Sequence, residues 1–128
     1  MAERETAPAR LPLTRMRDRP SFLAANRGRR YAAPGFVLLV HDRRDGDPAI
    51  RVGFTVTRKI GNAVVRNRVK RRLRELARAA LPKGGQPGAD HVLIGRAGGI
   101  ERDFAAMRGE LEKALARTVR TAPPNQSR

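Results

Sequence analysis

The sequence of 128 residues has no cysteine, no tryptophan and only two histidines. The absence of cysteine excludes disulfide bonds, thiolate nucleophiles and cysteine-type zinc sites. His41 and His91 each lack a carboxylate or second histidine at metal-ligand spacing, so we expect both to be structural and predict no certain metal site. The only serines, Ser21 and Ser127, lie near the two ends, which argues against a Ser-His-Asp hydrolase. The residues therefore show no catalytic constellation.

Long hydrophobic runs and acidic residues are also scarce. No apolar run approaches the roughly 20 residues that span a bilayer. The stretch before Pro20 lacks the apolar region of a signal peptide, and its acids Glu3, Glu5 and Asp18 are unlike a transit peptide, so we expect a cytoplasmic protein. Lys and Arg number 28 against 12 Asp and Glu, a formal net charge of +16. Binding to phosphate groups is the commonest use of such an excess, so we expect a nucleic acid rather than a membrane as partner.

The length fits one domain with frayed ends. Residues 1–17 mix Pro, Ala, Thr and Arg with little periodicity, which predicts a disordered N-terminal extension. We predict a single RNA-binding domain over residues 18–120 and a disordered tail over residues 121–128.

Three segments have the pattern of strands. Phe36–Val40 is a continuous apolar run, Ile50–Thr57 alternates between apolar and polar residues, and His91–Gly95 is short and apolar. A turn rich in Asp, Gly and Pro separates the first two, so we expect them to form an antiparallel hairpin. Tyr31–Pro34 is predicted to be a connector.

Three helices are expected. Ser21–Arg27 is a short one with Ser21 as N-cap; a long one begins at the N-cap Asn62 and ends near Leu81, before Pro82; the last covers about Glu101–Val119. Phe54 and Phe104 are placed on core faces. The architecture is α+β, a small sheet with helices on one face. If the long helix joins two parallel strands, the general rule predicts a right-handed crossover.

The long helix has two different sides. At about 100° per residue, one side is an apolar stripe that should face the sheet, formed by Val65, Val69, Leu73, Leu76 and Ala80. The opposite side carries Arg66, Lys70, Arg74 and Arg78 at successive i,i+4 positions. Like charges at this spacing destabilise an isolated helix, so an anionic partner is expected to relieve them.

The residue types on the polar side suit RNA. Arginine binds phosphate in bidentate fashion and stacks on bases, and the Asn67 amide can both donate and accept hydrogen bonds. Gly61 and Asn62 form a turn and cap, and the free N–H groups there attract phosphate next to Arg58 and Lys59. Phe22 could stack on a base, although a core position is the stronger inference from the residues alone.

The stretch Thr57–Glu75 contains Gly61-Asn62-Ala63-Val64, followed by Arg66-Asn67-Arg68 and Lys70-Arg71. It closely resembles the signature of the bacterial ribonuclease P protein component. The resemblance extends over about Phe22–Arg117. It implies the accessory subunit of a ribonucleoprotein endoribonuclease that removes the 5′ leader of precursor tRNA. In that family the RNA subunit is the catalyst and binds most of the Mg²⁺. The protein is a monomer in the holoenzyme, with no organic cofactor.

The resemblance also implies a fold and two binding surfaces. The fold is a two-layer α+β sandwich with a mixed sheet and a left-handed crossover through the basic helix, similar to the second domain of a small-subunit ribosomal protein. The predicted surface for the catalytic RNA comprises Arg58, Lys59, Arg66, Asn67, Arg68, Lys70, Arg71, Arg72 and Arg74. The predicted leader-binding cleft comprises Phe22, Val37, Leu39, Thr55 and Lys59.

Two departures from the family pattern concern the leader. A second aromatic residue one turn after Phe22 is replaced by Ala25 and Asn26, and Leu39 stands where some members have tyrosine. We therefore expect leader contact to depend less on stacking. The alternatives left open are a structural ribosomal-type RNA-binding protein, a nuclease acting without RNA and a DNA-compacting protein.

Overall fold

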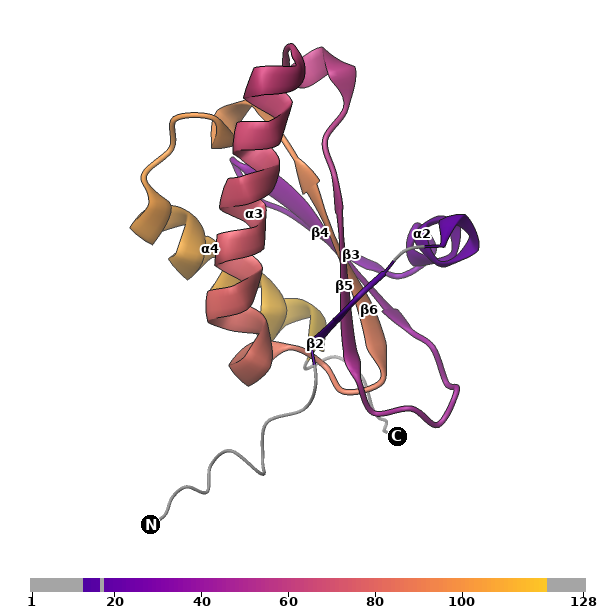
Figure 1. Cartoon of the computed structure of the whole chain (residues 1–128). Helices are drawn as coiled ribbons and strands as arrows, with labels where there is room; N and C mark the ends of the chain where they lie inside the picture. Colours follow the sequence, from indigo (N-terminus) through magenta and orange to yellow (C-terminus); the bar gives the residue numbers. More distant parts are fainter. Residues whose placement is uncertain (1–12, 17, 120–128) are drawn as a thin grey trace.

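The computed structural model describes residues 13–16 and 18–119. Figure 1 shows a twisted sheet with helices on both of its sides. In chain order the elements are β2 (Leu13–Arg15), α2 (Arg19–Ala25), β3 (Arg29–Ala32), β4 (Phe36–Asp42), β5 (Ile50–Thr55), the short 3-10 helix η1 (Arg58–Ile60), α3 (Ala63–Gly84), β6 (Ala89–Gly95), η2 (Ala97–Gly99) and α4 (Phe104–Val119).

The strands form one mixed sheet in the order β2-β5-β6-β4-β3. β6 pairs parallel with β5 on one side and antiparallel with β4 on the other. The expected hairpin between Phe36–Val40 and Ile50–Thr57 is therefore wrong, because β6 lies between these two strands. Val92 and Leu93 point to opposite faces and are both buried, as expected for the central strand of a sheet covered on both sides.

The segment β5–α3–β6 connects two parallel neighbours, and its crossover is left-handed (Figure 1). The general rule of right-handed crossovers fails here, and the handedness implied by the family resemblance holds.

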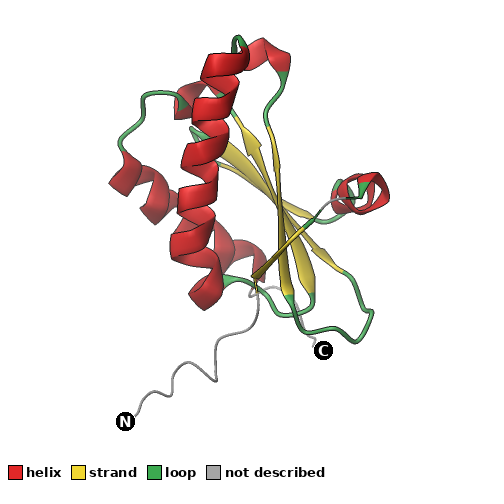
Figure 2. Ribbon diagram, viewed as in Figure 1, coloured by secondary structure: helices red, strands yellow, loops and turns green. Residues whose placement is uncertain are grey.

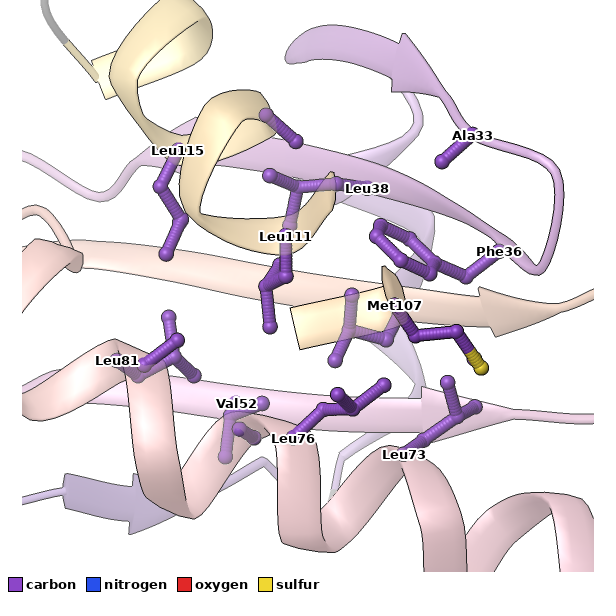
Figure 3. Packing of buried hydrophobic residues seen from close by; sticks show 14 of the residues in the cluster. Ala33, Phe36, Leu38, Val52, Leu73, Leu76, Leu81, Met107, Leu111 and Leu115 are labelled. Carbon is purple, nitrogen blue, oxygen red and sulfur yellow. The ribbon is translucent and has the colours of Figure 1, made fainter. Parts of the chain in front are cut away.

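Helices α3 and α4 pack on one face of the sheet and α2 on the other (Figure 2). The expectation that all helices share one face is wrong for α2. The larger core lies between the sheet and the α3–α4 layer, where leucines and Met107 from the two helices point toward the strands (Figure 3). Leu73, Leu76 and Leu111 are completely buried, and each such side chain contributes about 2 kcal/mol by leaving water.

Several predicted boundaries need correction. β2 lies within the stretch 1–17 that was expected to be disordered; it pairs parallel with β5 and is followed by the buried Met16. The rest of the predicted disordered ends, residues 1–12 and 120–128, lies outside the described residues. Part of the predicted connector Tyr31–Pro34 belongs to β3, an edge strand that pairs with β4. The N-cap of α2 is Asp18, whose carboxylate accepts the backbone N–H of Ser21 at 3.1 Å.

The ends of the other two helices also differ from the expectation. α3 continues through Pro82 to Gly84, so this proline does not end the helix at Leu81 as the sequence predicts. α4 begins only at Phe104, which is 37% exposed and so does not occupy the predicted core position.

Candidate RNA-binding surfaces

The basic helix α3 begins at a well-formed cap. The side-chain oxygen of Asn62 accepts the N–H of Val65 at 3.0 Å, which confirms Asn62 as the N-cap. The residues before it, Arg58 and Lys59, lie in η1 and are both exposed. Their charges flank the start of α3, where backbone N–H groups are free of intrahelical partners. This end of the helix is therefore a positively charged, accessible surface.

The apolar stripe of α3 packs as predicted. Val69, Leu73 and Leu76 are completely buried, Ala80 is nearly so, and Val65 packs against the edge of the core. This packing fixes the rotation of the helix about its axis. The arginine-rich side of α3 must consequently face away from the sheet.

Most predicted residues of the RNA surface are accessible. Asn67, Arg68 and Arg71 are exposed, while Arg66, Lys70 and Arg74 are half-buried. Two ion pairs formed by α3 side chains are found among the described residues: Arg68 with Glu101 at 3.7 Å and Arg78 with Glu75 at 3.3 Å. Both are exposed, and such pairs contribute little. The remaining charges of this side are uncompensated and available to a polyanion.

Arg72 has a different environment. Its guanidinium donates to the backbone carbonyl of Arg102 and lies 3.4 Å from the sulfur of Met107. Arg72 thereby fastens the segment before α4 to α3. The family resemblance predicts Arg72 as an RNA-binding residue, and its tertiary contacts add a structural role that the sequence does not indicate.

A second surface lies on the opposite face of the sheet, around α2. Its apolar cluster consists of Met16, Ala25, Val37, Leu39 and Val92, with Phe22 and Ile94 packed against it. The sheet approaches α2 closely at Gly53, where a Cβ atom would lie 2.5 Å from Cζ of Phe22. Phe22 is therefore seated on the backbone of β5, with one part of its ring buried and another accessible.

The predicted leader-binding residues divide into two groups. Phe22 and Thr55 are half-buried on this face, and Lys59 is exposed near the end of β5. Val37 and Leu39 lie on the same face but are 7% and 1% exposed, so in this structure they form the packed floor beneath α2. Of the predicted leader-binding residues, the accessible ones are thus Phe22, Thr55 and Lys59.

Arg51 links α2 to the sheet, a role that the sequence did not indicate. Its guanidinium donates to the hydroxyl of Ser21 at 2.9 Å and forms ion pairs with Asp18 at 3.5 Å and with Asp90 at 3.0 Å. Asp90 is 2% exposed and also pairs with Arg43 at 3.1 Å. The hydrogen bonds from Ser21 to Asp18 are the main cause that lowers the pKa of Asp18. Arg51 therefore holds the start of α2, and with it Phe22, at a fixed place over β5.

No metal centre emerges from the described side chains. Across residues 13–16 and 18–119, no three His, Cys, Asp or Glu residues come together as a metal site requires. Asp45 and Asp47 accept backbone N–H groups of their own loop, which confirms their assignment as turn formers. His91 is buried between β5 and the loop after α3, and is structural as predicted. Within the same residues, no helix has both the length and the apolarity needed to cross a bilayer.

The α+β fold has a left-handed crossover whose helix presents arginines to solvent. A basic helix face of this kind is the electrostatic footprint of a nucleic-acid-binding protein. The sequence model of the Ribonuclease P family matches residues 12–119. The chain belongs to the bacterial ribonuclease P protein component family.

Known relatives agree with this assignment. The chain is 60% identical over 102 residues to the ribonuclease P protein component of Erythrobacter litoralis, covering 80% of this chain and 83% of the relative. It is 52% identical over 102 residues to that of Gluconacetobacter diazotrophicus, covering 79% and 87%. The solved structure of the RNase P protein from Thermotoga maritima is similar with a TM-score of 0.68 at 32% identity, covering 80% of this chain and 96% of that one.

Proposed function

We propose that this protein is the subunit that binds the catalytic RNA of ribonuclease P and the 5′ leader of precursor tRNA, while the RNA carries out the cleavage. The observation that carries the proposal is the arginine-rich side of α3, which faces away from the sheet and forms one weak ion pair, Arg68 with Glu101, among the described residues; its members are Arg66, Asn67, Arg68, Lys70, Arg71 and Arg74. Family membership supports the role in tRNA processing. The described residues offer no set of side chains suited to protein-based hydrolysis.

The two surfaces divide the work between two RNA partners. The α3 side would contact phosphates of the RNA subunit, where each contact releases counterions. The face that carries Phe22, Thr55 and Lys59 would contact the single-stranded leader, with Phe22 supplying the aromatic surface for a base. Binding the leader favours precursor over mature tRNA, because the mature product lacks this segment.

Magnesium is proposed to be bound mainly by the RNA. Among the described residues of the protein, no three His, Cys, Asp or Glu side chains come together in a way that could hold a metal ion. The protein's cationic side chains instead screen phosphate repulsion, which would let the RNA fold and bind Mg²⁺ at lower concentration. A cytoplasmic location follows from this proposal, because bacterial precursor tRNA is processed there.

A reconstitution tests the proposal. Cleavage of precursor tRNA by the RNA subunit is measured at low Mg²⁺ concentration, with and without the protein. We expect the protein to raise the rate and to increase the affinity for precursor over mature tRNA. A rate that the protein does not change would refute the proposal, and equal affinity for ribosomal RNA and the ribonuclease P RNA would favour a ribosomal-type role. Cleavage by protein without RNA would show a protein nuclease instead.

A further inference from the structure

A second cationic site lies at the C-terminal end of α2, at the opposite end of the sheet from the start of α3. A cavity of about 330 Å³ opens there, which we call the α2-end pocket. It lies where the end of α2, the start of β3 and the end of β4 meet. Its lining consists of Arg27, Gly28, Arg29, Val40, His41, Asp42 and Arg44. None of the residues predicted to bind the catalytic RNA or the leader belongs to it.

The positive charges of the α2-end pocket exceed its negative charge. Asp42 is its one acidic side chain, and it forms an ion pair with Arg29 at 3.3 Å and accepts a hydrogen bond from the Gln86 amide. Arg29 and Asp42 therefore neutralise each other. Arg27 and Arg44 are both exposed, and neither forms an ion pair with any acidic residue in the described part of the chain. Two arginines are thus left for an anion from outside.

His41 contributes a polar group without a partner. Its Nδ1 atom is buried and makes no hydrogen bond to any described residue. His41 follows Leu39 at the next position on the α2 face of β4, opposite Asp90 of β6. Buried polar atoms normally find partners, because leaving one unpaired costs free energy. A phosphate oxygen could accept a hydrogen bond from Nδ1–H of the tautomer that carries its proton there.

The backbone of Arg44 is held in a costly conformation. Its φ is 58°, the only positive φ of a non-glycine residue in the described part of the chain. The preceding residue, Arg43, is 6% exposed in its side chain and anchors the loop by donating to the carbonyls of Asp47 at 2.8 Å and Ala49 at 2.9 Å. Strained backbone of this kind concentrates at functional sites. Arg43 therefore fixes the loop with Arg44 exposed at the rim of the α2-end pocket.

The position of Arg27 is also fixed by a close backbone contact. A Cβ atom on Gly28 would lie only 2.1 Å from the carbonyl oxygen of Val40, so glycine lets the start of β3 lie directly against β4. Arg27 consequently stays at the edge of the cavity, next to the strand that carries His41. The two uncompensated arginines thus come from two separately anchored backbone segments, which is a preorganised arrangement.

The geometry points to the phosphate backbone of single-stranded RNA as the occupant. We propose that the α2-end pocket binds leader nucleotides farther from the cleavage site than those in the cleft at Phe22. Of its lining residues, His41 continues the α2-covered face of β4 that carries Val37 and Leu39, and the exposed Arg30 pairs with Leu39 in the register of β3 and β4. Exposed, uncompensated arginines on separate segments suit successive phosphates of a strand. The inference rests on the proposed function and extends it to longer leaders.

The test uses the reconstituted holoenzyme and precursor tRNAs whose leaders are lengthened one nucleotide at a time. Wild-type protein should show an increase in affinity once the leader is long enough to reach the α2-end pocket. The double variant Arg27→Gln/Arg44→Asn, in which Asn tolerates the left-handed backbone, should lose this increase by about tenfold while short leaders bind as before. In this variant, the slope of log K for binding of long-leader precursor tRNA against log salt concentration should become shallower by about 1.4, which is about 0.7 for each of two lost phosphate contacts.

The double variant Lys113→Gln/Arg117→Gln, at two exposed positions on α4, is the matched control for the loss of two positive charges and should leave both leader classes unchanged. Circular dichroism checks that each variant is folded. Undiminished affinity of the double variant for long leaders would overturn the inference, as would an equal loss for short and long leaders. Failure of the proposed function itself would look different, because wild-type protein would then show no leader-dependent affinity at any length.

Discussion

Acidification from pH 7 to pH 5 should destabilise this protein through His91. The ring is completely buried; Nε2 accepts the N–H of Gln86 at 3.0 Å and Nδ1 lies 3.1 Å from the carbonyl oxygen of Arg51. This arrangement requires a neutral ring with its proton on Nδ1. Burial is the main cause that lowers the pKa of His91 from 6.5 to about 4. Folding therefore depends on keeping this ring uncharged.

The lowered pKa sets both the sign and the size of the effect. Between pH 6.5 and about 4 the unfolded chain binds a proton that the folded protein excludes, so stability falls as the pH falls through this window. At about 1.36 kcal/mol per pKa unit, the full window corresponds to roughly 3 kcal/mol, and about 2 kcal/mol of it is lost between pH 7 and pH 5. The total free energy of unfolding of a small domain is only about 5–15 kcal/mol, so this loss is a substantial part of it.

Urea unfolding followed by circular dichroism at pH 7 and pH 5 measures this loss. The carboxylates of Asp18, Asp42 and Asp45 have lowered pKa values, so their contributions are lost only below about pH 4 and do not interfere. His91→Gln keeps one donor and one acceptor but does not titrate, and it should remove most of the pH dependence. An equal loss of stability in wild-type protein and His91→Gln would refute the reasoning.

Four further predictions concern α3, α2 and α4. Arg68→Ala should weaken binding to the ribonuclease P RNA by about tenfold, and the slope of log K against log salt concentration should become shallower by about 0.9, while circular dichroism shows an intact fold. The control Lys113→Ala should change neither the affinity nor the slope. Unchanged RNA affinity of Arg68→Ala in moderate salt would refute the assignment of Arg68 to the RNA surface. Arg51→Met should release the start of α2 and weaken leader-dependent affinity by about tenfold without affecting RNA docking; equal losses in both assays would contradict this. Val69→Asp buries an unpaired charge against the sheet and should abolish cooperative thermal unfolding. Gly109→Ala, at an exposed α4 position where no atom lies within 4 Å of the new Cβ, should raise the free energy of unfolding by about 0.8 kcal/mol in urea titrations.

The parts of the fold that the sequence predicts well are those with long periodic patterns. The stripe from Val65 to Ala80 and the alternation from Ile50 to Val56 each give the element and its buried face, because periodicity records which side leaves water. The same stripe locates the exposed arginines of α3. The outward orientation of these side chains was therefore predictable, whereas the tertiary contacts of Arg72 were not.

The features that the sequence does not predict are strand order, edge strands and the roles of two arginines, and they depend on contacts between distant residues. The apolar pattern of β4 and β6 shows that both are buried but does not say which strand is the neighbour. β2 and β3 are short edge strands with the polar composition of loops, which protects sheet edges from aggregation and also hides them from prediction. The roles of Arg51 and Arg72 are set by partners on other elements, and no local signal distinguishes them from arginines that face solvent.

The strand order has a consequence for how the chain reaches this structure. β6, the central strand, is the last strand to be synthesised, so β5 and β4 cannot join into one sheet until residues 89–95 have left the ribosome. Until then α3, with its arginines already exposed, has no complete sheet to cover its leucines. Such pairing between distant segments slows folding. The nascent chain therefore presents α3 before the sheet is complete, and RNA that bound the proposed surface of this helix early would meet a partly formed protein.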